Sequence, residues 1–173
     1  MLIVSNTSPI NYLVLIEAVE VLPALHQQVV IPVAVWEGLR APGSPGPVRA
    51  WTRNPPCWLE VLRPISAPDE RLAHLGQGEG DAILLAQELN ATLVIDEVKA
   101  YREAKRRNIP TVRTLAILDK AAERGLIDLT QAVERLRQTN FRVQPEILDQ
   151  LLERHGARSQ PPSQSTQTPP NSG

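Results

Sequence analysis

Short apolar runs alternate with amphipathic helical patterns along most of this chain of 173 residues. A run of this kind that is too short for a helix and is followed by a polar turn predicts a buried strand. The predicted strands are Leu2–Val4, Val29–Ile31, Trp58–Leu62, Thr92–Ile95 and Ile109–Val112. Strands that alternate with helices and are apolar on both faces are typical of a parallel sheet. We therefore expect an α/β fold with a central parallel sheet covered by helices on both faces.

The helices are predicted from their capping residues and from their apolar spacing. Ser8 is the expected N-cap of a helix over Pro9–Glu17, and Asp69 the expected cap of a short helix. The other predicted helices are Val33–Leu39, Gly78–Leu89, Ala100–Arg107, Leu115–Arg124, Leu129–Arg137 and Pro145–Arg154.

Two segments lack these patterns. Residues Ala41–Pro56 are rich in proline and glycine, which predicts a long surface loop within the domain. Residues 157–173 consist mostly of Pro, Ser, Gln and Thr and cannot bury enough apolar surface to fold. We therefore expect one domain over residues 1–156 and a disordered tail over 157–173.

The composition limits the compartment and the partners. A formal net charge of -1 gives no overall attraction to nucleic acid, so any such contact requires a local basic patch. The single cysteine permits no internal disulfide, which suits a reducing cytosol. The apolar runs are too short to span a membrane. We expect a cytoplasmic protein that does not act at a membrane.

Acidic and amide side chains gather where the predicted strands end. Asn6 follows the first strand, and Asp96 and Glu97 follow the strand that begins at Thr92. The carboxyl ends of parallel strands form one edge of the sheet, where α/β proteins place their sites. Helix residues that can reach the same edge are Glu37, Glu79 and Asp81. Oxygen ligands of this kind suit Mg²⁺ or Mn²⁺, and the scattered histidines argue against zinc.

Each carboxylate also has a structural interpretation. Glu79 and Asp81 lie in a helical first turn, where acids interact favourably with the helix dipole. Asp81, however, shares a helical stripe with Leu84 and Leu85, which favours a role on the buried side. Asp96 can serve as a helix N-cap, and Glu37 as a solvated helix acid.

Basic side chains follow the acidic strand end directly. Lys99, Arg102 and Arg106 share one face of the predicted helix. They form either a solvated helix face or a strip that binds the phosphates of RNA. The two interpretations are compatible.

Five stretches, in this order, resemble the PIN-domain ribonucleases, in particular the branch named DUF3368. They cover about residues 1–156 and read VSNTSPINYL, VVIPVAVWEGL, GQGEGDAILLAQELNATLVIDE, KAYREAKRRNIPTVRTLAILDKAAERGLI and FRVQPEILDQLLERHG. The resemblance implies a three-layer α/β/α sandwich. It also implies acids that hold Mg²⁺ or Mn²⁺ and cleave single-stranded RNA, often in the VapC-like toxin of a toxin–antitoxin pair. A homodimer and a small antitoxin protein are the implied protein partners.

Carried over by position, the resemblance assigns catalytic and metal-binding roles to Asn6, Glu37, Asp81 and either Asp96 or Glu97. It adds Glu79 as an extra ligand or a supporting group. The family commonly has Asp where this chain has Asn6. An amide oxygen can bind a hard cation but contributes no charge and cannot act as a base. The sequence therefore predicts a metal-dependent endoribonuclease that Asn6 weakens or inactivates, or alternatively a non-catalytic PIN-fold module that binds RNA or protein.

Overall fold

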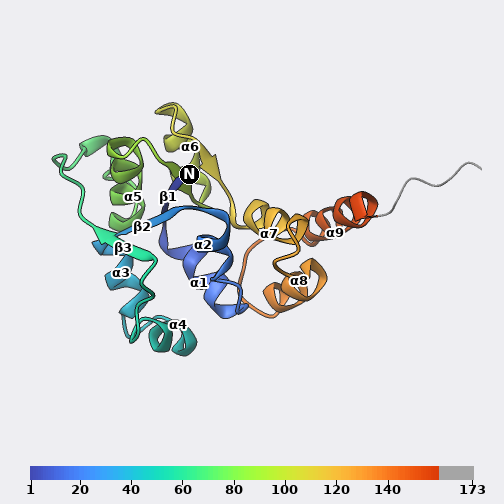
Figure 1. Cartoon of the computed structure of the whole chain (residues 1–173). Helices are drawn as coiled ribbons and strands as arrows, with labels where there is room; N and C mark the ends of the chain where they lie inside the picture. Colours follow the sequence, from blue (N-terminus) through green and yellow to red (C-terminus); the bar gives the residue numbers. More distant parts are fainter. Residues whose placement is uncertain (160–173) are drawn as a thin grey trace, which may run out of the picture. The chain divides into compact units, whose positions relative to one another are not determined.

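The computed structural model describes residues 1–159, which divide into two compact units. The first comprises Met1–Arg142 and contains a five-stranded parallel sheet in the order β3-β2-β1-β4-β5 (Figure 1). Its strands are β1 (Leu2–Ser5), β2 (Gln28–Pro32), β3 (Leu59–Leu62), β4 (Thr92–Val94) and β5 (Thr111–Val112). All five predicted strands are therefore present, with ends shifted by at most two residues.

Helices cover both faces of this sheet. In the first unit they are α1 (Thr7–Leu15), α2 (Val21–Leu25), α3 (Val33–Arg40), α4 (Gly46–Trp51), η1 (Glu70–Leu72), α5 (Gln77–Glu88), α6 (Val98–Arg106), α7 (Thr114–Glu123) and α8 (Leu129–Arg137). Helix α5 packs on β1, β2 and β4 together with α6, whereas α1 and α2 lie on the opposite side (Figure 1). The predicted α/β/α sandwich is confirmed.

The strand order places the ends of β1 and β4 side by side. Ser5 pairs with Val94, and the backbone N–H of Asn6 donates to the Val94 carbonyl at 3.1 Å. Because β1 and β4 are inner strands with apolar neighbours on both faces, their positions are fixed by the core. The residues that follow them, Asn6 and Asp96, consequently meet at one edge of the sheet.

Two helices were not predicted, and both contain proline. The expected loop Ala41–Pro56 is wrong in its middle, because α4 begins at Gly46 and accommodates a proline in its first turn. Val48 of α4 is fully buried, and α4 packs against α1, so tertiary contacts stabilise this short helix. Helix α2 is likewise short and buries Val21 and Leu22.

The start of α1 also differs from the prediction. The helix begins at Thr7, so Asn6 rather than Ser8 occupies the N-cap position, and the Asn6 side chain makes no capping hydrogen bond. The predicted Asp69 cap is confirmed, since its carboxylate accepts from the Arg71 N–H at 3.0 Å. Asn6 and Ser8 are therefore free to contact other elements.

The second unit begins at Val143 and includes α9 (Pro145–Ser159). Residues 157–159, which the sequence assigned to the tail, belong to this helix. The rest of the predicted tail, residues 160–173, lies outside the described residues. Among residues 1–159 no helix is both long and apolar enough to cross a lipid bilayer.

A partly buried ion-pair network connects the end of α6 to the segment before α5. The Arg107 guanidinium binds Glu103 and Asp69, each at 2.8 Å, and its side chain is only 11% exposed. Hydrogen bonds from Arg71 first and Arg107 second hold the pKa of the Asp69 carboxyl well below its usual range, and the Arg107 hydrogen bond lowers the pKa of Glu103. By contrast Arg106, which also pairs with Glu103, is 78% exposed.

We expect Arg107→Gln to lower the unfolding midpoint at pH 7 by about 5 °C, because it removes the partly buried cation that two carboxylates share and leaves each of them with one exposed arginine. A depressed carboxyl pKa contributes stability above the pKa of the unfolded chain, and this is lost as the pH falls through the folded value. The difference between variant and wild type should therefore shrink below about pH 4. Thermal unfolding at several pH values measures this. Arg106→Gln is the matched control and should shift the midpoint by less than about 2 °C.

Candidate active site

The Asn6 side chain links the segment that follows β1 to the segment that follows β4. Its side chain is 3% exposed, and its amide nitrogen donates to Glu97 Oε2 at 3.0 Å. The Ser8 hydroxyl, in the first turn of α1, donates to the other oxygen of the same carboxylate. Glu97 thus receives two hydrogen bonds from the segment that follows β1, which fixes the carboxylate at this edge.

Asp96 is held from the opposite side by Thr114, the first residue of α7. Its carboxylate accepts from the Thr114 N–H at 3.0 Å and from the Thr114 hydroxyl at 2.6 Å. Burial raises the pKa of Asp96, the Thr114 hydrogen bonds oppose this rise, and the charge of Glu97 adds to it. The predicted N-cap role is wrong, since Glu97 occupies the N-cap position of α6. Asp96 is therefore a half-buried, oriented carboxylate next to a second one.

Glu79 approaches the same edge from the first turn of α5. Its carboxylate accepts from the Gly76 N–H at 3.1 Å. Burial raises the pKa of Glu79, the Gly76 bond lowers it, and the charge of Glu97 raises it further. The next residue back, Gly78, lies so close to Asn6 that an added Cβ would be 3.6 Å from Asn6 Oδ1.

We call Asn6, Glu79, Asp96 and Glu97 the acidic edge. These four of the six predicted metal ligands are brought together by direct hydrogen bonds or by electrostatic interaction. The family resemblance leaves open whether Asp96 or Glu97 is the ligand. In the structure both carboxylates lie at the acidic edge, and each is oriented by its own hydrogen bonds, so the geometry does not require a choice between them.

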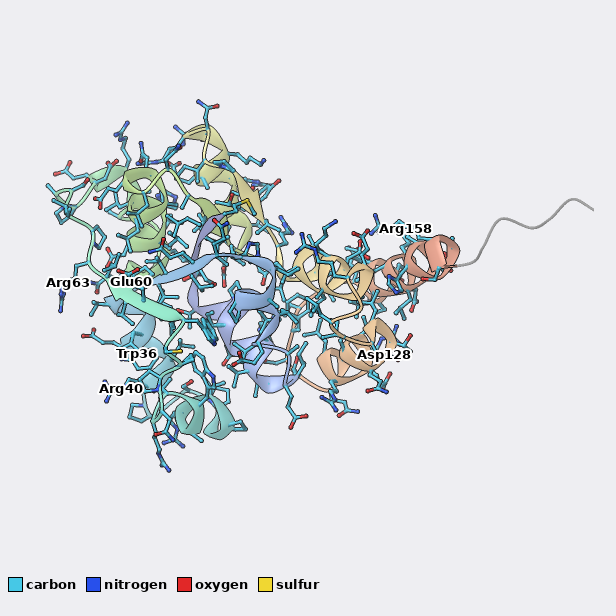
Figure 2. All side chains as sticks on the ribbon, viewed as in Figure 1. Trp36, Arg40, Glu60, Arg63, Asp128 and Arg158 are labelled. Atoms are coloured by element: carbon cyan, nitrogen blue, oxygen red, sulfur yellow. The ribbon has the colours of Figure 1, made fainter. Side chains whose placement is uncertain are left out.

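Asp81 and Glu37, the other two predicted ligands, are not part of this group in the structure. Asp81 lines a cavity between α5 and the segment before it, and burial raises its pKa while the charge of Arg63 lowers it. Figure 2 shows Arg63 beside the end of β3. Glu37 is exposed on α3, next to the Trp36 ring over which Arg40 lies at 5.8 Å (Figure 2). The metal-binding and catalytic roles of Asp81 and Glu37 stay predictions.

The basic residues predicted to bind RNA all lie on α6. Lys99 and Arg102 are exposed, and the positive charge of Lys99 lowers the pKa of Glu79. Arg106 instead pairs with Glu103 at 3.1 Å. RNA binding by the three residues stays a prediction, and Lys99 is the one that the structure links to the site.

Four residues near the site were not predicted to belong to it. Thr114 orients Asp96, and it follows a predicted strand, so the strand-end rule that found Asp96 could also have found Thr114. Tyr12, Asn140 and Phe141 form a side-chain cluster, in which the Tyr12 hydroxyl donates to Asn140 Oδ1 at 3.1 Å. No local sequence signal links Tyr12 to residues so distant in the chain.

Comparison with known proteins agrees with this architecture. The family model DUF3368, described as a PIN domain, matches residues 2–157. The chain belongs to this PIN-domain family. The PIN domain is structurally similar to a PilT N-terminus domain protein from the hyperthermophilic archaeon Sulfolobus solfataricus, with a TM-score of 0.52 and 20% sequence identity. That similarity covers 70% of this chain and 93% of the archaeal one and supports the fold alone. No curated protein matches the chain.

The PIN domain has the nuclease-like fold of its family, and PIN domains generally use divalent metal ions. Every side chain of the acidic edge offers oxygen, as Mg²⁺ or Mn²⁺ requires. Within residues 1–159, none of its three carboxylates forms an ion pair with a basic side chain. In the same range, no three His, Cys, Asp or Glu side chains are grouped closely enough to hold a metal. The donor chemistry fits a hard cation, and its binding would require the Asn6–Glu97 contact to rearrange.

Proposed function

We propose that this PIN domain is a metal-dependent endoribonuclease whose site is the acidic edge. One observation carries the proposal: the half-buried carboxylate of Asp96 and a second carboxylate adjoin after an inner strand, and neither forms an ion pair with a basic side chain within residues 1–159. The charge of Glu97 raises the pKa of the neighbouring Asp96 carboxyl, and a bound cation would offset this repulsion.

Asp96, Glu97 and Glu79 would hold Mg²⁺ or Mn²⁺ in this proposal, with the Asn6 amide oxygen as a neutral ligand. When bound, such an ion lowers the pKa of water and stabilises the charge that develops on a phosphodiester. Thr114 keeps the Asp96 carboxylate in one orientation, and Ser8 does the same for Glu97. Lys99, near Glu79, contributes a positive charge that attracts the phosphate backbone of single-stranded RNA.

The test is cleavage of a fluorescently labelled single-stranded RNA by the purified chain. We expect fragments with Mn²⁺ or Mg²⁺ and none in EDTA. Glu37→Gln and Asp81→Asn examine the ligands that family resemblance adds. Unchanged cleavage by both variants would limit the site to the acidic edge, whereas loss would show that these acids join it when the metal binds. Absence of any metal-dependent cleavage by the unaltered chain would contradict catalytic function.

The second candidate is a PIN-fold module that binds RNA or protein without cleaving it. The contact between the Asn6 amide and Glu97 favours it, because the amide supplies the hydrogen-bond donor that the carboxylate needs in the absence of a cation. Metal-independent RNA binding without cleavage, together with cleavage by Asn6→Asp, would support this candidate.

A toxin role, a small antitoxin partner and a homodimer follow from the resemblance to VapC-like proteins and are part of the proposal. Exposed apolar side chains that a partner can cover include Val98 and Leu126, which are 50% and 44% exposed. Growth arrest on expression of the chain, relieved by the product of a neighbouring small gene, is the corresponding observation. Light scattering measures the oligomeric state directly.

A further inference from the structure

A cavity of about 460 Å³ opens directly beside the acidic edge. Asp96 and Glu97 form part of its wall, so the cavity is continuous with the place where a phosphodiester would be cleaved. The remaining walls come from α1, from the start of α6 and from the segment that follows α8, and they include Tyr12, Asn140 and Phe141. Its volume is in the range of small-molecule sites.

Direct contacts between side chains hold the aromatic wall of the cavity in place. The Tyr12 and Phe141 rings meet edge to face, with centroids 4.8 Å apart and an angle of 86° between their planes. The Tyr12 hydroxyl donates to Asn140, which lies next to Phe141 in the chain. These contacts hold the Phe141 ring against the cavity although it lies on an irregular segment.

The polar groups of the cavity complement the aromatic wall. The Asn140 amide offers donors and acceptors of the kind that bind base edges, and Arg142 brings a positive charge to the same wall. Sequence-specific recognition of single-stranded RNA typically places a base on an aromatic ring and hydrogen-bonds its edge. A wholly apolar ligand would cover Arg142 and the two carboxylates without offering them a hydrogen bond.

We propose that this cavity is a base-binding subsite that takes one nucleobase of a single-stranded RNA, with Phe141 as the stacking surface and Asn140 as the group that contacts the base edge. The inference rests on the proposed function, because it places the base next to the phosphodiester at the acidic edge. It makes the cavity, rather than α6 alone, the part of the protein that positions the strand.

Phe141 is the single phenylalanine of the chain, which allows a selective probe. The full-length protein is labelled with 4-fluorophenylalanine, and its one fluorine resonance is followed in EDTA, which prevents metal-dependent cleavage. Short oligoadenylate, oligocytidylate and oligouridylate are titrated separately. Ribose 5-phosphate is the probe that lacks a base. We expect a saturable shift with the oligonucleotides that differs among the three bases, and none with ribose 5-phosphate.

Fluorescence anisotropy of labelled RNA gives the second measurement. Phe141→Leu should weaken binding about tenfold, as loss of one base–aromatic stack does. Trp58→Leu is the matched control, because Trp58 precedes β3 at the far edge of the sheet and bonds Glu20 there. It should bind as the wild type does.

Each outcome separates this inference from the proposed function. Metal-dependent cleavage with an unmoved fluorine resonance and unchanged binding by Phe141→Leu would overturn the subsite and leave the nuclease intact. A base-dependent shift without any cleavage would support the subsite and contradict the nuclease. An equal shift with ribose 5-phosphate would show a phosphate site instead, and the absence of any RNA binding would overturn the subsite as well.

Discussion

Asn6→Asp is expected to make the stability of this protein depend on divalent metal. The Asn6 amide now donates to Glu97 Oε2 at 3.0 Å, so the change replaces a hydrogen bond by two carboxylate oxygens in the same place. In EDTA we expect the unfolding midpoint to fall by about 5 °C, because the new carboxylate and that of Glu97 repel each other in a half-buried place. Mn²⁺ should restore the midpoint and raise it above that of the wild type, since the extra charge strengthens metal binding.

Thermal unfolding in EDTA and in Mn²⁺ measures this, and Asn6→Ala is the matched control. Alanine removes the donor without adding a charge, so Mn²⁺ should raise its midpoint less than it raises that of Asn6→Asp. Cleavage of single-stranded RNA should increase about tenfold or more in Asn6→Asp. Equal midpoints of Asn6→Asp in EDTA and Mn²⁺ would show that no metal binds between residues 6 and 97.

Asp96→Asn is expected to abolish cleavage without unfolding the protein. The raised pKa of Asp96 means that its ionised form is less favourable in the folded chain than in the unfolded one, so the charge lowers stability at neutral pH. Asparagine removes that charge and can still accept from the Thr114 N–H. We expect an unfolding midpoint equal to or slightly above that of the wild type, and cleavage reduced about 100-fold or more.

The control for this variant is Glu60→Gln. Glu60 is an exposed carboxylate on β3, at the far edge of the sheet, and it bonds only Gln28 among the described residues (Figure 2). This variant should cleave RNA at the wild-type rate. A large loss of activity in both variants would indicate a general electrostatic effect, and an active Asp96→Asn would remove Asp96 from the site.

The sheet and most helices could be predicted because their sequence signals are local. Apolar runs such as Thr92–Val94 and capping residues such as Asp69 determine where elements begin and end. Helices α2 and α4 escaped prediction because each is short and contains proline, and burial of residues such as Val48 stabilises them. That burial depends on packing between distant elements, which the local sequence does not contain.

The candidate site also has features that the local sequence predicts and features that depend on distant contacts. Asn6, Asp96 and Glu97 follow strands and were found from that position alone. The partners of these side chains were not predicted, because the Asn6–Glu97 hydrogen bond joins residues 91 positions apart. The helix acids were the hardest to place. Glu79 and Asp81 are two positions apart on α5, which turns their side chains about 200° from each other around the helix axis, so only one of them can face Glu97.

Calorimetric titration of Mn²⁺ into the unaltered chain, Asn6→Asp and Asp96→Asn tests the acidic edge as a metal site most directly. We expect binding to the unaltered chain, binding about tenfold tighter to Asn6→Asp, and none to Asp96→Asn at the same concentrations. Undetectable binding to both the unaltered chain and Asn6→Asp, or equal binding to all three proteins, would contradict the proposal that these residues hold the catalytic metal.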